Sequence, residues 1–414
     1  MTDPESTRRQ GSAHGFSTRA IRAASRPPRV DQRPTSVPIY QSATFASGDA
    51  DELAAVTTGT QPGYAYARID NPTDTALADA IAELEGAEAA YVFASGMAAI
   101  HAALVALVRA GDRIVCTRAV YGSTRSLLEN VLGPLGVRTE FVDATDLDAV
   151  EAALTAAPVR VLYAETISNP TMVVVDHAAL AALAHRHGAA YLVDNTFASP
   201  YVCRPVELGA DLSIESATKY IGGHSDVLAG SVAGSAELIR EVRRVQIDTG
   251  ATLAPLAAFL VLRGLATLAV RVERHASSSV ALATWLERQD GVGRVIHPQL
   301  ASHPQRAVVQ RVLAGGSSGM FAFELAGGRH AARAFVDALT VPERTASLGS
   351  IHTMVVHPPS TTHRQFDDAA LAEAGIGPGL LRCSVGLEDV AELQADFAVA
   401  LDAARAATPE PATA

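Results

Sequence analysis

The segment Ala190-Tyr191-Leu192-Val193-Asp194 is a short apolar stretch that ends on a carboxylate, and Ser216-Ala217-Thr218-Lys219 follows the next such stretch, Asp211–Ile214. Short apolar runs of this kind are typical of buried strands. In a parallel sheet, the carboxyl ends of neighbouring strands lie along one edge, and ligands bind beyond that edge. We therefore expect Asp194 and Lys219 to meet there.

From about Thr73 onward, the surrounding chain alternates between strand and helix patterns. The predicted strands are Ala90–Ala94, Arg113–Cys116, Val159–Ala164, Ala190–Val193 and Asp211–Ile214, and the predicted helices are Thr75–Leu84, Ala98–Ala110 and Ser126–Leu135. This alternation predicts an α/β domain with a mostly parallel sheet that helices cover on both faces.

The last third of the chain has a different pattern, which begins with a long helical region over Pro255–Arg288. Its predicted strands are Val292–Ile296, Gly319–Leu325 and Leu380–Val385, and its predicted helices are Ala331–Leu339 and Val390–Ala406. We therefore predict an N-terminal arm over residues 1–60, a large domain over 61–257 and a smaller α+β C-terminal domain over 258–414.

The two ends of the chain have compositions that do not favour a packed core. Residues 1 to about 35 are rich in Arg, Ser and Pro and lack periodicity, so we expect them to be disordered alone or to lie on a partner subunit. The tail after Ala407 is rich in Pro, Thr and Ala, and we expect it to fray.

The composition of the whole chain argues against several classes of function. With 414 residues, 48% of them hydrophobic, the chain can bury the cores of two or three domains. A net charge of −11 and a pI near 5.6 argue against binding to nucleic acid or to an anionic membrane. The three cysteines are far apart, so they predict neither a disulfide framework nor a zinc site, and they fit a reducing cytoplasm.

Two features concern membranes and export. The first residues, Met-Thr-Asp-Pro-Glu, lack the apolar core of a secretory signal. The apolar stretch Pro255–Val272 contains Arg263, which favours an amphipathic helix over a membrane span. We therefore expect a cytoplasmic protein that binds no membrane and no metal.

Lys219 is the only lysine among the 33 Lys and Arg residues. A strong bias toward arginine removes lysine from ordinary surface positions, so on composition alone the last lysine could lie anywhere. Imine formation, however, requires a primary amine that can lose its proton, and a guanidinium with a pKa above about 12 cannot supply one. The position of Lys219 after a predicted strand therefore favours a reactive amine.

Three neighbouring segments predict what this amine would bind. Beside a pyridine nitrogen, Asp194 would keep that nitrogen protonated, and a pyridinium ring is the electron sink of pyridoxal-phosphate (PLP) chemistry; the alternative is an Asp that caps a helix. Ser95-Gly96-Met97 would offer free N–H groups at a helix start to an anion, and the hydroxyls of Ser216 and Thr218 could join them. Together these features predict a PLP site in which Lys219 holds the cofactor as a Schiff base.

Further candidates have an ordinary structural role as their alternative. Arg68 and Tyr66 could clamp a phosphate, with the arginine as a bidentate donor, or could simply lie on the surface. Tyr121 could stack on a ring and move protons, or it could pack half-buried. Arg382, in a predicted strand, could hold a substrate α-carboxylate or form an ordinary ion pair.

The chain also contains a series of short motifs in a characteristic order. They are Gly63–Arg68 (GYAYAR), Asn71–Thr73, Ser95–Met97, Tyr121–Gly122, Glu165–Thr171 (ETISNPT), Asp194–Thr196, Ser216–Lys219, Gly222–Asp226 (GGHSD), Ser347–Gly349 and Leu381–Asp389 (LRCSVGLED). Over about residues 36–406 the series resembles the Cys/Met-metabolism family of PLP-dependent enzymes. That family includes cystathionine γ-synthase, the cystathionine lyases, methionine γ-lyase and O-acetylhomoserine sulfhydrylase.

The resemblance implies a fold-type I (aspartate-aminotransferase-like) large domain and a role for each matching residue. Lys219 would hold PLP and move protons, Asp194 would pair with the ring nitrogen, and Tyr121 would stack on the ring and assist the leaving group. The implied phosphate ligands are Ser95, Gly96, Met97, Ser216 and Thr218, together with Tyr66 and Arg68 from the neighbouring subunit. Asn169 would lie near the ring hydroxyl, and Arg382 with Ser347 would hold the substrate carboxylate. Because such a site needs two subunits, the resemblance implies a dimer, and family members are typically homotetramers.

The resemblance also implies a reaction, which is γ-elimination on a sulfur amino acid to give a thiol, 2-oxobutanoate and ammonia. Methionine or a methionine-like thioether is the favoured substrate, with cystathionine as another possibility, because His352 stands where many cystathionine enzymes carry a glutamate. Asp248–Ala251 resembles the methionine γ-lyase branch. By contrast, Ser123 stands where those lyases commonly carry cysteine, and Gln246-Ile247 stands where they carry Lys-Asp.

Two other functions remain open at this point. One is γ-replacement, by a cystathionine γ-synthase or an O-acylhomoserine sulfhydrylase, because elimination and replacement share their early steps. The other, more remote, is a non-catalytic regulator with the PLP fold, although the acidic chain contains no basic helix-turn-helix segment.

Overall fold

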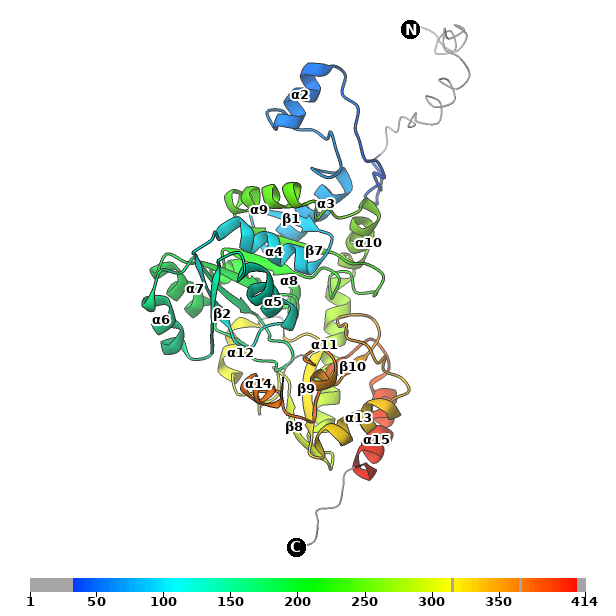
Figure 1. Ribbon diagram of the computed structural model, residues 1–414. Coiled ribbons are helices and arrows are strands. Elements are labelled where there is room, and N and C mark those ends of the chain that lie inside the picture. Colours follow the sequence, from blue (N-terminus) through cyan, green and yellow to red (C-terminus); the bar gives the residue numbers. More distant parts are fainter. Residues whose placement is uncertain (1–32, 314–315, 365–366, 408–414) are drawn as a thin grey trace, which may run out of the picture. The chain divides into compact units, whose positions relative to one another are not determined.

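The computed structural model describes residues 33–313, 316–364 and 367–407, and the chain from Ile39 onward forms one unit. The arm predicted over residues 1–60 lies outside the described residues up to residue 32, and the predicted tail lies outside them from residue 408. Within the described part of the arm, helix α2 (Ala50–Thr58) buries none of its residues, and it extends away from the sheet (Figure 1).

A seven-stranded sheet has the order β1-β7-β6-β5-β4-β2-β3. Its strands are β1 (Ala89–Phe93), β2 (Arg113–Thr117), β3 (Arg138–Val142), β4 (Val161–Glu165), β5 (Ala190–Asp194), β6 (Leu212–Glu215) and β7 (Gly230–Gly234). Only β7 runs antiparallel to its neighbours, β6 and β1. The mostly parallel α/β sheet and the five predicted strands are therefore confirmed, whereas β3 and β7 were not predicted.

Helices cover both faces of this sheet (Figure 1). The large-domain helices are α3 (Pro72–Glu85), α4 (Gly96–Leu107), α5 (Gly122–Ser126), α6 (Leu147–Ala156), α7 (His177–Arg186), α8 (Ser199–Val202) and α9 (Ala236–Thr249), with a 3-10 turn at Pro205–Leu208. Alternate residues of β4 enter two different cores: Val161 and Tyr163 pack with α4 and α9, and Leu162 and Ala164 pack with α6 and α7. This period of two is what a strand buried on both faces requires.

The capping residues of α3 show how the local sequence sets its ends. The side chain of Asn71 accepts a hydrogen bond from the Thr73 N–H at 2.9 Å, and Pro72 occupies the first helical position, where its missing N–H costs nothing. Gly86 ends the helix with a φ of 67°, in the left-handed region that favours glycine.

Two predicted helices differ from the observed ones. In place of the predicted helix over 126–135, the chain forms α5 and then a π-helical turn, Leu127–Leu132, because the helix begins earlier, after Tyr121, and the chain leaves it at Gly133-Pro134. The predicted helix over 255–288 is two helices, α10 (Pro255–Leu265) and α11 (Leu268–Leu286), bent by 61°. At the break, Arg271 donates to the Gly264 carbonyl at 2.7 Å, so this carbonyl is bonded by a side chain.

The α10–α11 pair bears on the expected absence of a membrane span. In the described part of the chain, no single helix has the length and apolar character needed to cross a membrane. Taken together across their bend, α10 and α11 do meet those two criteria.

A second, four-stranded antiparallel sheet has the order β10-β11-β9-β8. Its strands are β8 (Val292–Ile296), β9 (Met320–Leu325), β10 (Met354–Val356) and β11 (Leu380–Ser384), and its helices are α12 (Arg306–Val312), α13 (Gly328–Ala338), α14 (Asp368–Glu373) and α15 (Val390–Ala406), with a 3-10 turn at Pro358–Ser360. In the core of this sheet, Phe323 and Phe397 both pack edge-on against Phe335, and they lie tilted against one another. The predicted α+β architecture of this region is confirmed, except that β10 was not predicted.

Three free cysteines are buried in different places: Cys116 in β2, Cys383 in β11, and Cys203 just after α8. Burial raises the pKa of each thiol above its usual value. All three therefore remain neutral thiols in the folded chain at neutral pH.

Glu85, at the end of α3, is a fully buried acid whose neighbours include Glu215. Burial raises its pKa to about 7, and this rise outweighs the lowering by the neighbouring polar groups of Ser213 and Glu215. Because the folded chain keeps a proton that the unfolded chain releases near pH 4.5, stability falls as pH rises from about 4.5 to about 7.

We expect Glu85→Gln to stabilise the protein increasingly over this range, by up to about 3 kcal/mol above pH 7. The amide carries no proton to lose, so the cost of keeping the acid neutral disappears. Thermal unfolding of wild type and variant at pH 5, 6, 7 and 8 measures the effect. Glu83→Gln, on the exposed side of the same helix, is the control. A constant difference between Glu85→Gln and wild type at all four pH values would contradict the expectation.

Candidate active site

The carboxyl ends of β4, β5 and β6 meet at one edge of the seven-stranded sheet. In the strand register, Glu165, the last residue of β4, lies opposite Asp194, the last residue of β5, and Asp194 lies opposite Ile214 of β6. The loop after β6 contains Lys219. A cavity of about 360 Å³ lies at this edge. It is lined by Ser95, Gly96, Met97, Ile100, Tyr121, Ser123, Glu165, Ile167, Asn169, Asp194, Thr196, Phe197, Ser216, Thr218, Lys219, Leu228, Ala346, Leu348, Thr362 and Arg382.

Lys219 lies half-buried in this cavity, and its Nζ donates to the hydroxyl of Ser347 at 2.9 Å. Burial, and then the nearby guanidinium of Arg382, lower the pKa of the Lys219 amine to about 8. A substantial fraction of the amine is therefore neutral near physiological pH. A neutral amine is the form that attacks a carbonyl carbon and that accepts protons.

Asp194 enters the same cavity from β5. Its Oδ1 accepts the Thr196 N–H at 3.0 Å, and the Thr196 hydroxyl accepts the Ser216 N–H at 2.8 Å, so the two strand ends are tied together. Burial raises the pKa of Asp194, while the hydrogen bonds from Thr196 lower it. An acid in such a position gains from a cationic partner, because the opposite charge compensates for the lost hydration.

The start of α4 and the loop after β6 form an anion cradle. Ser95 caps α4 by accepting the Ala98 N–H at 3.2 Å, and the first N–H groups of a helix have no partner within the helix. A Cβ on Gly96 would lie 2.7 Å from the Cβ of Ser216, so only glycine lets the two segments approach this closely. Gly230 of β7 serves the same approach, since its Cβ would lie 2.2 Å from the carbonyl oxygen of Ser95.

Thr218 also lines the cavity, but its hydroxyl is engaged within its own loop. Its Oγ1 accepts the Ala229 N–H at 2.9 Å and lies 3.1 Å from the Ala229 carbonyl oxygen, to which it donates. Thr218 therefore fixes the loop between Lys219 and β7. To donate to a bound phosphate, the hydroxyl would have to turn away from that carbonyl.

Arg382 reaches the cavity from β11 of the smaller sheet and is almost fully buried. Its guanidinium donates to Asn169 Oδ1 at 3.0 Å and to the Ser347 carbonyl at 2.9 Å. Its Nε–H is buried without a hydrogen-bond partner among the described residues. Burial lowers its pKa to about 10, so it stays cationic at neutral pH and can bind an anion.

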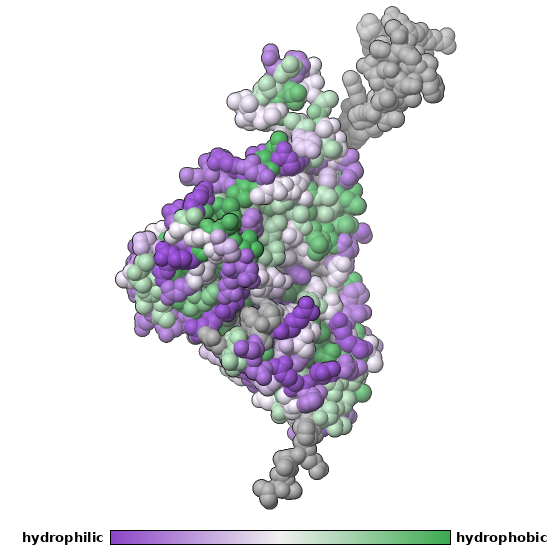
Figure 2. All heavy atoms as spheres, viewed as in Figure 1, coloured by the Kyte–Doolittle hydropathy of each residue, from purple (hydrophilic) through white to green (hydrophobic). Residues whose placement is uncertain are grey.

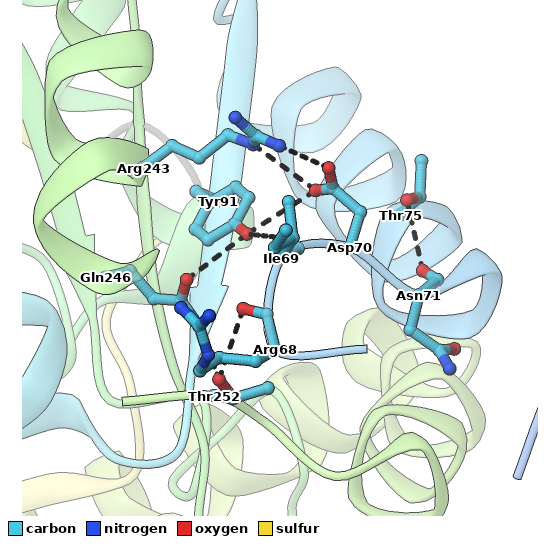
Figure 3. A network of polar contacts seen from close by, with 9 residues as sticks. All are labelled: Arg68, Ile69, Asp70, Asn71, Thr75, Tyr91, Arg243, Gln246 and Thr252. Atoms are coloured by element: carbon cyan, nitrogen blue, oxygen red, sulfur yellow. Dashed lines mark hydrogen bonds and ion pairs between the residues drawn. The ribbon is translucent and has the colours of Figure 1, made fainter. Parts of the chain in front are cut away.

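Tyr66 and Arg68 do not line this cavity. Both are exposed, and the Arg68 guanidinium lies 5.5 Å from the Tyr66 ring and donates to the Ile247 carbonyl at 2.6 Å. Figure 3 shows how the segment that follows them is anchored: the hydroxyl of Tyr91 donates to the Ile69 carbonyl at 2.6 Å, and Arg243 forms an ion pair with Asp70. Tyr66 and Arg68 are thus held at the surface and are not part of the Lys219 cavity of their own subunit.

The structure therefore brings most of the predicted residues together. Asp194, Lys219 and Arg382, with the cradle segments, Tyr121 and Asn169, line one cavity, and Ser347 contacts Lys219 directly. His352 is exposed and is not among the lining residues.

One acidic residue of the cavity was missed in the sequence analysis. Glu165 ends the predicted strand over 159–164 as Asp194 ends its own, so the reasoning that selected one carboxylate applies equally to the other. Burial, and then the neighbouring Asp194, raise the pKa of Glu165 well above its usual value.

These groups fit pyridoxal phosphate. The volume is within the range of about 300–1,000 Å³ that is typical of small-molecule sites. The cavity offers a nucleophilic amine for the aldehyde, a carboxylate for the ring nitrogen and a cradle for the phosphate. The unpartnered Nε–H of Arg382 leaves a donor for a further anion, such as the carboxylate of an amino acid.

Comparison with known proteins agrees with this fit. Residues 17–402 match the family described as Cys/Met metabolism PLP-dependent enzyme. The chain is 43% identical to an L-methionine gamma-lyase of Pseudomonas putida, over 94% of this chain and 98% of the relative. It is 40% identical to an O-succinylhomoserine sulfhydrylase of Pseudomonas aeruginosa, over 94% and 95%.

A solved structure adds the cofactor. A Campylobacter jejuni protein named for O-acetylhomoserine (thiol)-lyase matches with a TM-score of 0.87 and 30% identity, over 91% of this chain and 97% of that one. It contains N′-pyridoxyl-lysine-5′-monophosphate, a lysine joined to the cofactor. PLP is therefore the cofactor, and the chain belongs to the Cys/Met metabolism PLP-dependent enzyme family.

Proposed function

We propose that this enzyme catalyses γ-elimination on a sulfur amino acid, with L-methionine or a methionine-like thioether as substrate. With one water consumed, the products would be a thiol, 2-oxobutanoate and ammonia. The main support is the single cavity that combines Lys219, Asp194 and Arg382. Among the described residues that line it, the acids are Asp194 and Glu165, both at the sheet edge, so none is left at a distance for the remote ammonium of cystathionine.

Each residue would have a distinct task. Asp194 would hold the proton on the ring nitrogen, and the cradle over 95–97 with Ser216 would bind the phosphate. Arg382 would orient the substrate by its α-carboxylate, and Asn169, which receives a hydrogen bond from Arg382, would lie near the ring hydroxyl. When bound, PLP supplies a cationic ring that accepts the electron pair left at the substrate Cα.

The proton transfers would be made by Lys219 and Tyr121. The neutral amine of Lys219 would take the proton from substrate Cα and give it up to the bound cofactor. Once neutral again, it would take a second proton from Cβ. Tyr121 would stack beside the ring and assist departure of the thiol from Cγ by supplying a proton to sulfur. Each positioned proton donor or acceptor is worth about 10²–10⁴-fold in rate.

A second candidate function is γ-replacement on an activated homoserine. The 40% identity to the O-succinylhomoserine sulfhydrylase favours it as the alternative. Both reactions need the same amine, acid and carboxylate clamp. In elimination a thiol leaves Cγ, whereas in replacement a carboxylate such as succinate leaves Cγ and a thiol or sulfide takes its place.

The test is to incubate the holoenzyme with L-methionine, with L-cystathionine, and with O-succinylhomoserine plus sulfide. We expect 2-oxobutanoate and a thiol from methionine in excess over the other mixtures. Homocysteine formed from O-succinylhomoserine at a higher rate would favour replacement. No 2-oxobutanoate from methionine or from cystathionine would overturn the elimination proposal.

We also propose that the active site is shared between subunits of a cytoplasmic homotetramer. Tyr66 and Arg68 lie away from their own cavity, so their phosphate-clamping role requires a second copy of the chain. Leu228 lines the cavity yet is 67% exposed, which suits a residue that another subunit covers. Figure 2 shows hydrophobic residues on the face where α10 lies in Figure 1, and Leu256 of α10 is likewise half exposed.

The proposed cytoplasmic location has a separate support: the three buried, unbridged cysteines fit a reducing compartment.

The proposed sharing predicts complementation between two defective variants. Arg68→Ala removes the clamp that a subunit offers to its neighbour, and Lys219→Ala removes the amine of its own cavity. A mixed dimer would contain one cavity with both groups intact. We therefore expect co-expressed chains to regain activity that neither variant has alone, measured as 2-oxobutanoate release. If activity in the mixture equals the sum of the separate variants, the shared site is contradicted.

The division near residue 257 also remains a proposal. Its support is that each sheet has a hydrophobic cluster of its own, one between residues 93 and 242 and the other between residues 282 and 404, while a third cluster joins Ile167 and Phe197 to Ala322 of the smaller sheet. The proposed boundary falls within α10, so the helix would link the two domains.

A further inference from the structure

Glu165 makes two contacts that none of the roles above uses. Its side chain is almost fully buried at the end of β4, beside Asp194. One carboxylate oxygen accepts the Tyr121 N–H at 2.6 Å, and the other accepts the Asn169 N–H at 3.1 Å. A single carboxylate thus bridges the backbone of two loops that line the same cavity.

These contacts continue on the Asn169 side into a hydrogen-bonded path around the cavity. Asn169 Oδ1 accepts from Arg382 at 3.0 Å, and Arg382 donates to the Ser347 carbonyl at 2.9 Å. The Ser347 hydroxyl then accepts from the Nζ of Lys219 at 2.9 Å. The path therefore connects Tyr121 with Arg382 and Lys219, although these residues come from three distant parts of the chain.

The local fold explains why the bridge is needed at Tyr121. This residue stands directly before the short helix α5, and its own side chain makes no capping bond. Directly after β2 the loop is bonded through the Arg118 N–H to the Val142 carbonyl at 2.7 Å, and the Tyr121 N–H is bonded by a side chain from another strand. Glu165 supplies that group from β4, which is the neighbour of β2 in the sheet.

We propose that Glu165 is a positioning residue, which holds Tyr121 and Asn169 in fixed relation so that the Tyr121 ring and the Arg382–Lys219 pair face the same bound molecule. This inference rests on the proposed function for the tasks of Tyr121 and Arg382. Glu165 itself transfers no proton and binds no substrate in this role. Its effect is transmitted through the two backbone N–H groups.

The chemistry of the bridge requires two acceptor oxygens. In Glu165→Gln, one oxygen is replaced by an NH₂ group, which would face a backbone N–H and cannot accept from it. One loop therefore loses its tie, while the volume of the side chain is kept. Glu165→Asp keeps both oxygens on a shorter side chain and should preserve part of the bridge.

The experiment compares wild-type holoenzyme with Glu165→Gln, Glu165→Asp and Glu85→Gln. Glu85→Gln is the matched control, because Glu85 is also a buried acid with a raised pKa but does not line the cavity. The first readout is the visible circular dichroism of the bound cofactor relative to its absorbance, without substrate. This ratio reports how asymmetrically Tyr121 and its neighbours surround the ring.

We expect the ratio to change in Glu165→Gln, to change less in Glu165→Asp and to stay at the wild-type value in Glu85→Gln. For methionine turnover, leaving a buried backbone N–H without its acceptor should lower kcat/KM by about ten- to a hundredfold in Glu165→Gln. Tyr121→Phe provides a further measurement. If Glu165 acts through Tyr121, the effect of Tyr121→Phe on kcat should be smaller in the Glu165→Gln background than in wild type.

If Glu165→Gln has the wild-type dichroism ratio and the wild-type kcat/KM, the positioning role of Glu165 is overturned. Loss of the cofactor band in Lys219→Ala would, in that case, leave the proposed function intact. Failure of both Glu165 variants to fold would also overturn it, since Glu165 would then be a structural residue. If the dichroism ratio changes in Glu165→Gln as expected but the wild type releases no 2-oxobutanoate, the result would count against the proposed function alone.

Discussion

Lys219→Ala is expected to remove the visible absorption band of the bound cofactor and to lower methionine turnover by at least about 10⁴-fold, because in the proposed mechanism one amine both holds the cofactor and moves two protons. Absorbance between the near ultraviolet and the visible, with 2-oxobutanoate release, measures both effects. The chain has no second lysine that could take over.

Lys219→Arg is the matched control for this variant. The guanidinium keeps the positive charge next to Arg382 but does not release its proton at neutral pH. We therefore expect the same loss of band and turnover as in Lys219→Ala. Activity retained in Lys219→Arg would show that charge, and not amine chemistry, is what the position supplies, and would contradict the proposed mechanism.

Asp194→Asn should give the second-largest effect, a loss of about 10²–10³-fold in kcat/KM, the scale on which one preorganised group contributes in a water-poor site. The amide keeps the size of the side chain but cannot stabilise a proton on the ring nitrogen. A second consequence has a definite sign. Asp194 contributes to the raised pKa of Glu165, so its neutralisation should lower that pKa.

The control for Asp194→Asn is Asp146→Asn. Asp146 is an exposed acid that caps α6 by accepting the Ala149 N–H at 3.0 Å, and asparagine caps a helix about as well as aspartate. Steady-state kinetics of both variants give the comparison. A kcat/KM for Asp194→Asn equal to that of Asp146→Asn would rule out a role for the Asp194 charge in the reaction.

The sequence was most informative where hydrophobic runs are continuous. Strands β4 and β5 are buried on both faces, and such strands leave an apolar signal that ends on a polar residue. Strand β7 has the sequence GSVAG, in which Gly230 allows the close approach to Ser95, and its glycine and alanine residues carry little strand preference. Its position between β1 and β6 could not be predicted from composition.

The site was predictable for a related reason. Asp194 and Lys219 were found because parallel strands align their carboxyl ends, and this rule needs no side-chain detail. The two backbone contacts of Glu165 depend on how loops near residues 121 and 169 fold back on the sheet, and no periodic pattern encodes that. The resemblance supplied the role of Arg382, since the sequence pattern around it equally allows an ordinary ion pair.

Because buried thiols lie in both sheets, their chemical labelling can measure the local opening of the folded chain. Cys116 belongs to the larger sheet and Cys383 to the smaller one, so a maleimide pulse would modify each only when its surroundings open. Mass spectrometry of the labelled peptides would then yield separate opening rates for the two sheets. Rates that rise together in denaturant would identify one cooperative unit, and rates that diverge would identify two that melt independently.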